Sequence, residues 1–403
     1  MNTGPMRLLP LSGIRVLDLT RLLPGGLASQ MLGDLGADVI KIEEPGMGDY
    51  SRLMPPLFNG MGLGYLAINR NKRSLALNLK NERGRAVFRR LAERADVVLE
   101  SFRPGVMERL ELGYTHLRKL NDRLVYCAIT GYGQHGPYHL RAGHDLNYLG
   151  YAGLLYHNRP GSDVPPMMPP TQLADIAGGA LPAVIGILAA LAGRANSDKG
   201  RFVDVSMMEN ALTLMPLLAA TTLNTGEEPA PGAGHLQGGL PAYHIYQTKD
   251  GQAITLGALE PKFWAAFCER VGRPDLVGLH LPADAEEREA ARDALRALFL
   301  TKTRDEWVAE FAEVETCFGP VNSLSEALRD PQVEALGTVR RADYGASGEF
   351  GTLAFAPRIE GVPFEVRHAP PALGEQTREI LLHAGYTDEE LTRLRDEGAI
   401  WWP

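Results

Sequence analysis

The sequence predicts an α/β fold, with a mostly parallel sheet in the first half of the chain and a smaller α+β region after it. Three observations support this prediction. Short β-rich runs alternate with helical patterns over the first two hundred residues. Two of these runs, DVVLESF and RLVYCAIT, are almost continuously apolar, as in strands that helices cover on both faces. A stretch dense in Gly and Pro, residues 225–239, then separates this half from a segment of different composition.

The individual elements follow from these patterns in chain order. In the first half we expect strands at 14–20, 37–43, 74–80, 96–102, 123–130 and 199–207 and helices at 26–35, 82–94 and 209–224. Residues 46–64, rich in Gly, Met and Pro, are expected to form a long loop. Beyond residue 239 we expect a hairpin around Asp250-Gly251 and helices at 261–271, 285–300, 304–313, 377–384 and 388–397.

Composition excludes several classes of protein. The 403 residues are 45% hydrophobic and 22% charged, which is ordinary for a globular protein and unlike a disordered chain. The formal net charge of -8 argues against a dedicated nucleic-acid binder, which carries a basic surface. Cys127, Cys268 and Cys317 are too scattered for a disulfide framework or a zinc site. The N-terminal stretch also lacks the apolar core of a signal peptide, so we expect a cytoplasmic protein.

Residues 176–193 contain no charged side chain and reach the length of a membrane-spanning helix. The stretch is mostly Ala and Gly, contains Pro182 and follows Asp175 directly. We therefore expect a tightly packed core helix and no membrane partner.

The segment GYGQHG at residues 131–136 has the spacing of a dinucleotide-binding loop and follows a predicted strand. That function requires a helix to begin at the loop, and here Pro137 follows with no amphipathic pattern behind it. A turn-rich loop at the carboxyl edge of the sheet is the better interpretation.

Three segments carry candidate chemistry. In RAGHDLNY, His144 lies in a Gly-flanked loop just after a strand, where α/β sheets place ligands, although a lone histidine is more often structural. In LADIAGG, Asp175 is either a helix N-cap or a reactive carboxyl, and the amides of Gly178 and Gly179 are candidate oxyanion donors. In GALEPKFW, Glu260 either caps a helix or orients an imidazole.

These segments, together with PLSGIRVLDLTRLLPGG, NRNKRSLALNLK, ESFRPGVMERLELGY and KGRFVDVSMMENA, resemble the class III CoA-transferase superfamily. Within it they are most similar to the α-methylacyl-CoA racemases, and the similarity spans nearly the whole chain. The resemblance implies a Rossmann-like large domain, a smaller domain and an interlocked homodimer. It places the first part of the CoA-binding domain at 1–205, a linker at 206–239, the small domain at 240–335, and the return to the large domain at 336–403.

The resemblance also implies an acyl-CoA thioester as substrate, with no further cofactor and no metal, and branched fatty acid metabolism as the setting. His144 and Asp175 match the racemase residues that exchange the α-proton, and Glu260 matches the glutamate beside the histidine. The expected substrate contacts are Gly143, Asp145, Leu146, Asn147, Tyr148, Leu77, Asn78, Leu79, Lys80 and Arg109, with Gly178 and Gly179.

CoA transfer is the alternative reaction. Transferases of the superfamily use the matching aspartate as a nucleophile, form acyl-aspartyl anhydrides and generally lack the histidine. Glu44, at a position where some racemases carry an arginine, the long 48–67 loop and the segment LGEQTREIL depart from the racemase pattern. A non-catalytic CoA-binding homologue is a third alternative, against which the joint presence of His144, Asp175 and Glu260 argues.

Racemisation makes sense of these residue types. A thioester α-hydrogen is weakly acidic, so a site must stabilise the enolate and place one acid/base group on each face of the carbon. His144 and Asp175 are the expected pair. The basic residues available to CoA phosphates are Arg70, Lys72, Arg73, Lys80, Arg103 and Arg109, most of which we expect to be surface charges.

Overall fold

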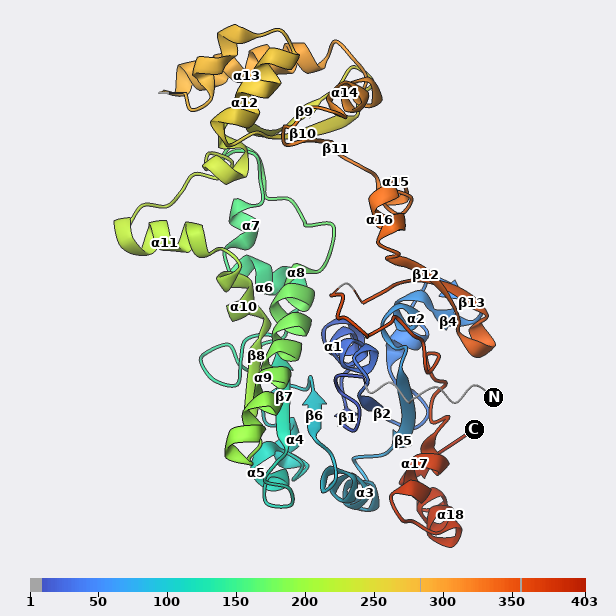
Figure 1. Cartoon of the computed structure of the whole chain (residues 1–403). Coiled ribbons are helices and arrows are strands. Elements are labelled where there is room, and N and C mark those ends of the chain that lie inside the picture. The colour runs from blue at the N-terminus through green and yellow to red at the C-terminus, as the bar shows by residue number, and fades with distance from the viewer. Residues whose placement is uncertain (1–8, 283, 356) are drawn as a thin grey trace. The chain divides into compact units, whose positions relative to one another are not determined.

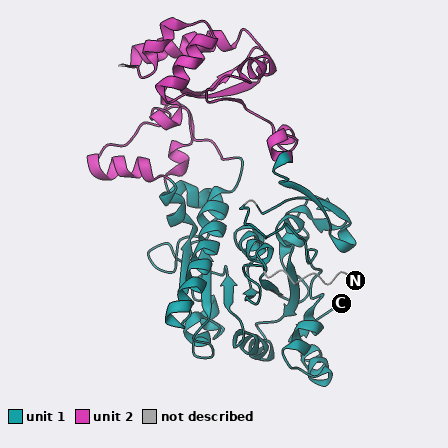
Figure 2. Ribbon diagram, in the orientation of Figure 1, with its two compact units in different colours: residues 1–152, 170–214, 335–403 teal, residues 153–169, 215–334 magenta. Residues whose placement is uncertain are grey.

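The computed structural model describes residues 9–282, 284–355 and 357–403. The chain divides into two compact units (Figure 2). Unit 1 takes residues 1–152, 170–214 and 335–403, and unit 2 takes 153–169 and 215–334. The expectation of no signal peptide concerns the N-terminal stretch, of which residues 1–8 lie outside the described residues. The predicted domain limits stay a prediction, because units defined by contacts need not fold independently.

Within the described residues, unit 1 is built on a seven-stranded sheet of order β14-β5-β2-β1-β6-β7-β8 (Figure 1). The strands are β1 (Arg15–Asp18), β2 (Asp38–Glu43), β5 (Lys72–Leu77), β6 (Val97–Glu100), β7 (Val125–Thr130), β8 (Phe202–Ser206) and β14 (Ile400–Trp401). All neighbours pair in parallel except β14, which is antiparallel to β5. The parallel strands have the doubly wound order, third-second-first-fourth-fifth-sixth in the chain, with the switch point between β1 and β6. The predicted α/β fold is confirmed.

Helices bury the faces of this sheet. One core joins strand residues such as Leu17 and Tyr126 to Phe88 of α3 and Leu381 of α17, all nearly inaccessible to solvent. Helices α1 and α9 pack against each other and against the strands. The helices of unit 1 are α1 (Leu22–Asp34), α2 (Leu63–Ile68), α3 (Glu82–Ala92), α4 (Val106–Arg109), α5 (Tyr114–Leu117), α6 (Asp145–Tyr151), α8 (Leu173–Asp175), η2 (Ile176–Ala180), α9 (Leu181–Ser197), α10 (Met207–Thr213), α17 (Thr377–His383) and α18 (Asp388–Asp396).

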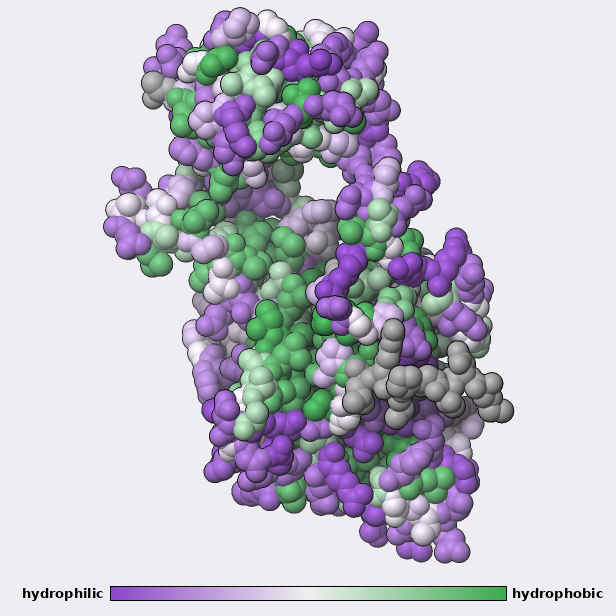
Figure 3. Space-filling view, viewed as in Figure 1, coloured by the Kyte–Doolittle hydropathy of each residue, from purple (hydrophilic) through white to green (hydrophobic). Residues whose placement is uncertain are grey.

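The apolar stretch tested for a membrane span is one continuous helix. Among the described residues, the run Leu173–Ser197 is long and apolar enough to cross a membrane by length and composition alone. Its α9 part packs one face, including Val184 and Ile187, against β7, β8 and α1. The other face is open, with Ile185 67% exposed, and apolar atoms gather over α9 on the visible surface (Figure 3). The expected core helix is therefore buried on one face only.

The predicted long loop at 46–64 is wrong in detail. It contains η1 (Tyr50–Arg52), the short strands β3 (Leu57–Phe58) and β4 (Met61–Gly62), and the start of α2. Phe58 and Leu66 pack against Phe350 of the distant hairpin β12 (Val339–Asp343) and β13 (Glu349–Leu353), which η5 (Gly345–Ser347) joins. Such long-range packing leaves no periodic signal in the local sequence.

The predicted helix 209–224 is two helices, α10 and α11 (Pro216–Thr225), because Pro216 has no amide to continue the hydrogen-bond ladder.

Unit 2 contains α11, α7 (Leu154–His157) and an antiparallel sheet of β9 (Tyr243–Gln247), β10 (Ala253–Gly257) and β11 (Phe318–Pro320). The expected hairpin is confirmed, with Gly251 at φ 74°. The hydrophobic core of unit 2 includes Trp264, Phe267 and Phe299. Its other elements are η3 (His235–Gly239), α12 (Pro261–Arg270), η4 (Pro274–Leu279), α13 (Ala285–Phe299), α14 (Arg304–Phe311), α15 (Leu324–Ala327) and most of α16 (Pro331–Ala335).

Candidate active site

A pocket opens at the carboxyl edge of the large sheet, around the switch point between β1 and β6. It is lined by the ends of four strands and by α4, and the lining residues are Leu19, Arg21, Ile42, Glu43, Glu44, Leu77, Asn78, Leu79, Lys80, Phe102, Val106, Arg109 and Leu110. All five residues predicted to contact CoA in the segments 77–80 and at 109 are among them. Arg21 and Phe102 were not predicted as contacts, although Arg21 directly follows a predicted strand and Phe102 is the last residue of another.

The pocket combines an apolar lining with opposed charges. Leucines, Ile42, Val106 and Phe102 supply the apolar part, while Arg21, Lys80 and Arg109 supply positive charge. A doubly wound sheet places ligands at this edge, so the pocket suits a flat organic ligand that carries anionic groups.

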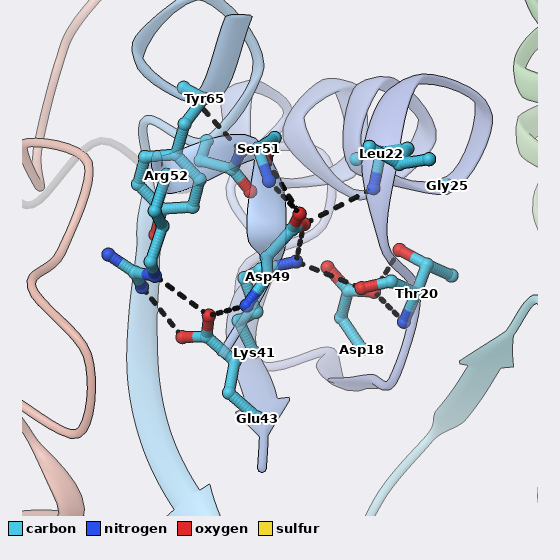
Figure 4. A network of polar contacts seen from close by, with 12 residues as sticks. Asp18, Thr20, Leu22, Gly25, Lys41, Glu43, Asp49, Ser51, Arg52 and Tyr65 are labelled. Atoms are coloured by element: carbon cyan, nitrogen blue, oxygen red, sulfur yellow. Dashed lines mark hydrogen bonds and ion pairs between the residues drawn. The ribbon is translucent and has the colours of Figure 1, made fainter. Parts of the chain in front are cut away.

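A buried polar network lies next to this pocket (Figure 4). Lys41 Nζ lies 3.0 Å from an Asp49 carboxylate oxygen and donates to the Thr20 carbonyl at 2.9 Å. Glu43 accepts from Arg52 at 2.7 Å and 2.9 Å and from the Asp49 amide at 3.0 Å. Burial alone would raise the pKa of Asp49, but the Lys41 ammonium and the Ser51 hydrogen bonds lower it to about 2. This network is fully paired and fixes the chain that leaves β2.

Three basic residues expected at the surface are instead held in ion pairs. Arg70 pairs with Asp34 at 2.6 Å, and Arg73 pairs with Asp38 at 2.7 Å. Lys72 is completely buried and donates to the Gly26 carbonyl and the Asn69 amide oxygen, both at 2.8 Å. Burial lowers the pKa of Lys72 to about 7, against the attraction of Asp18. The surface-charge expectation is wrong for Arg70 and Lys72, which stabilise the interior.

His144 lies at the N-cap of α6 and not in an open loop. Its backbone is extended there, at φ -127° and ψ 174°, and its amide donates to Asn147 Oδ1 at 3.0 Å. Because Asn147 occupies the third helical position, it satisfies the amide that precedes the helix, as in a capping box. The His144 side chain is exposed and makes no hydrogen bond within the described residues. Its imidazole is thus left available to a ligand.

Asp175 lies in the first turn of the helix that starts at Leu173, and Gln172 is the N-cap, so the simple capping interpretation of Asp175 is wrong. The Asp175 amide donates to Asp145 Oδ1 at 3.0 Å. That bond joins the LADIAGG segment to the residue that directly follows His144. Burial raises the pKa of Asp175 to about 7, and the charge of Asp145 adds to the effect. The helix then continues as the π-turn η2, a distortion frequent at functional sites.

Gly178 and Gly179 lie inside that π-turn and are buried. A Cβ on Gly178 would meet the Met207 carbonyl oxygen at 2.7 Å, and one on Gly179 would meet the Pro24 Cβ at 3.1 Å. The missing side chains therefore allow η2 to approach α10 and α1. The amides without a partner inside a helix are those of its first turn, here from Leu173 to Asp175, and the Asp175 amide already donates to Asp145. The role of the two glycines as donors therefore stays a prediction.

Tyr148 connects the histidine segment to Asp175. Its hydroxyl donates to the Gly143 carbonyl, and a Cβ on Gly143 would approach the Tyr148 ring to 2.6 Å. Burial, together with a smaller effect of the Asp175 carboxylate, raises the pKa of Tyr148 to about 12. Tyr132 packs edge-on at 5.2 Å between ring centroids. A neutral phenol thus forms one wall beside Asp175, while Leu146 and Asn147 are exposed on α6.

Glu260 belongs to unit 2. It is the N-cap of α12 and is exposed, and its side chain makes no capping hydrogen bond within the described residues. Its predicted role beside His144 stays a prediction.

The chain is similar to known proteins over nearly its whole length. The model of CoA-transferase family III matches residues 11–377. Succinyl-CoA:glutarate CoA-transferase from Mus musculus is 35% identical over 398 residues, covering 97% of this chain and 88% of the relative. α-Methylacyl-CoA racemase from Homo sapiens is 35% identical over 395 residues, covering 97% of each chain.

Solved structures share the fold. A CAIB/BAIF family protein from Brucella suis has a TM-score of 0.80 at 31% identity, and Rv3272 from M. tuberculosis has a TM-score of 0.81 at 30% identity. Each comparison covers 93% of this chain and 99% of the other. With a family model matched over most of its length and full-length relatives above 30% identity, the chain belongs to CoA-transferase family III.

Proposed function

We propose that the protein is an acyl-CoA racemase that inverts the α-carbon of 2-methylacyl-CoA thioesters. One observation carries the proposal: the hydrogen bond from the Asp175 amide to Asp145 joins the segment that carries His144 to a helix whose Asp175 carboxyl has its pKa raised by burial to about 7. A group with that pKa is present both protonated and ionised near neutral pH, as a reversible proton donor and acceptor must be.

The proposed substrate binds in two parts. The nucleotide part of CoA takes the pocket at the carboxyl edge, where Lys80, Arg109 and Arg21 offer positive charge to its phosphates. The thioester reaches His144 and Asp175, and Tyr148 packs beside it. We also propose that Glu260 lies beside His144, that the protein forms a homodimer and that it is cytoplasmic. The apolar exposed face of α9 is consistent with burial against a second subunit.

The proposed reaction moves one proton at each face of the α-carbon. Neutral His144 removes the α-proton of one enantiomer, and the electron pair of the C–H bond passes into an enolate. Protonated Asp175 then returns a proton to the opposite face and leaves as a carboxylate. The reverse direction starts from ionised Asp175 and protonated His144. A helix N-terminus alone would lower the pKa of an aspartate, but burial and Asp145 outweigh that effect here and supply the acid form.

CoA transfer between carboxylic acids is the second candidate. It is favoured by the similarity to succinyl-CoA:glutarate CoA-transferase, which equals the similarity to the racemase. In that reaction the Asp175 carboxylate attacks the thioester carbonyl, CoA leaves as a thiolate, and an acyl-aspartyl anhydride forms.

Two measurements on the wild-type protein separate the candidates. A racemase incorporates deuterium from heavy water at C2 of a 2-methylacyl-CoA without any acceptor acid, and hydroxylamine traps nothing. A transferase yields a hydroxamate with hydroxylamine, requires an acceptor acid for turnover and leaves C2 undeuterated. Absence of C2 exchange across a panel of branched acyl-CoAs would refute the racemase proposal.

A further inference from the structure

The chain leaves β2 with two adjacent carboxylates that have opposite surroundings. Glu43 faces inward, where Arg52, Ser74 and the Asp49 amide all donate to it. Glu44 faces the pocket, where its Oε1 accepts from Lys80 at 2.7 Å and its Oε2 lies 3.6 Å from Arg21. The first carboxylate anchors the backbone, and the second is presented at the pocket.

This arrangement places one carboxylate against two of the three cations that line the pocket. Lys80 and Arg21 both face Glu44, while Arg109 makes no ion pair within the described residues. The Lys80 hydrogen bond lowers the pKa of Glu44, so this carboxylate is ionised at neutral pH. An incoming phosphate has to compete for the same two donors and meets a like charge beside them.

We propose that Glu44 is a built-in counter-ion that competes with the phosphates of the acyl-CoA substrate for Lys80 and Arg21 and so weakens substrate and product binding. The inference rests on the proposed function, because it takes the pocket as the site of the nucleotide part of CoA.

The anchoring of Glu43 keeps the competitor in place. Arg52 holds Glu43 and Lys41 holds Asp49, so the backbone on either side of Glu44 is anchored beside the pocket. Lys80, by contrast, has a side chain that is 81% exposed and free to rearrange toward a ligand. The backbone of Glu44 is thus held in place, whereas the Lys80 side chain can change its conformation.

The test is calorimetric titration of wild type and Glu44→Gln with three probes: CoA, adenosine 3′,5′-bisphosphate and uncharged adenosine. Glutamine keeps the size of the side chain and removes its charge. We expect Glu44→Gln to bind CoA and the bisphosphate about tenfold more tightly at low salt, because a like charge at close range is removed, and to bind adenosine unchanged. The gain should shrink as salt is raised.

Glu349→Gln is the matched control. Glu349 is an exposed glutamate that pairs with Arg341 at 2.9 Å and does not line the pocket. It changes the net charge equally, so the affinity for CoA should stay at the wild-type value. The double variant Glu44→Gln/Lys80→Met should lose most of the gain, since the cation that Glu44 released is gone. Glu44→Ala serves as a second charge-removing variant, and thermal unfolding checks that each variant is folded.

The outcomes divide clearly. If wild type binds CoA but both Glu44 variants bind it no more tightly, the counter-ion inference is wrong and the proposed function stands. An equal gain for adenosine overturns the inference as well, since the effect would then be steric. If neither wild type nor variants bind CoA or the bisphosphate, the inference falls together with the pocket assignment of the proposed function.

Discussion

The buried network next to the pocket and the Asp145–Asp175 pair show two ways of handling a carboxylate inside one unit. Asp49 and Glu43 are surrounded by cations and donors, and their pKa values are lowered. Asp175 is partly buried and lies near another carboxylate, Asp145, and its pKa is raised to about 7. The first arrangement holds a charge permanently and positions backbone. The second leaves a proton free to move, which is what acid/base chemistry requires.

The comparison is tested most severely by Asp175→Asn. The amide keeps the size of the side chain and loses the ability to exchange a proton or attack a thioester. We expect turnover of 2-methylacyl-CoA to fall by at least about 10³-fold, with little change in the urea midpoint, because the native site already accommodates a neutral group there. Retention of wild-type turnover in a steady-state assay would contradict the reactive role.

Lys41→Met should reduce the stability of the protein, whereas Asp175→Asn should reduce its turnover. It leaves Asp49 buried without its cation, and we expect a loss of about 3–5 kcal/mol in the free energy of unfolding. Urea denaturation measures the loss, and Lys119→Met, which removes an exposed lysine, is the control with an expected change near zero. A Lys41→Met protein as stable as wild type would show that the network does not hold the fold.

Glu100 extends the comparison to a carboxyl that is nine-tenths or more buried. Burial raises its pKa to about 8, above the ordinary value of 4.5. The folded state therefore holds this proton between those two pH values while the unfolded state has lost it, so stability falls as pH rises toward 8. Glu100→Gln cannot lose a proton, and we expect it to be more stable than wild type by about 1–3 kcal/mol at pH 8.5. If the unfolding temperatures of the two proteins changed with pH in the same way, the predicted destabilisation by ionisation of Glu100 would be wrong.

Asp145→Asn gives the smallest expected effect. The amide oxygen still accepts from the Asp175 amide, but the negative charge that raises the pKa of Asp175 is removed. We expect the Asp175-dependent limb of the pH–rate profile to move to lower pH by about half a unit to one unit. Tyr151→Phe, a nearby neutral change, should leave that limb in place. A shift to higher pH would mean that Asp145 does not act through its charge.

Much of the fold was predictable because it depends on local patterns. The apolar runs of β6 and β7 and the Asp250-Gly251 turn each carry their own signal. The segment 46–64 does not, because its short strands are stabilised by a hairpin some three hundred residues away. Pro216 was visible in the sequence, and the helix break it causes follows from its missing amide alone.

The candidate site was predictable as residue types but not as a connected arrangement. The carboxyl ends of parallel strands meet at one edge, which is why 77–80 and Arg109 were found. The Asp145–Asp175 bond links positions thirty residues apart through helix packing, and no spacing rule predicts it. Lys72 and Arg70 were misjudged because a charge is expected at the surface unless its partner is known, and Asp18 and Asp34 lie far away in the sequence.

The central claim is that His144 and Asp175 act on one α-carbon, and His144→Ala tests it most directly. Each pure enantiomer of a 2-methylacyl-CoA is incubated with this variant in heavy water, and deuterium at C2 is followed by mass spectrometry with wild type alongside. We predict that racemisation is abolished and that C2 exchange is lost for the enantiomer whose proton His144 removes, while calorimetry still shows CoA binding at the wild-type affinity. Racemisation at the wild-type rate in the variant, or wild-type exchange of that enantiomer, would contradict the claim.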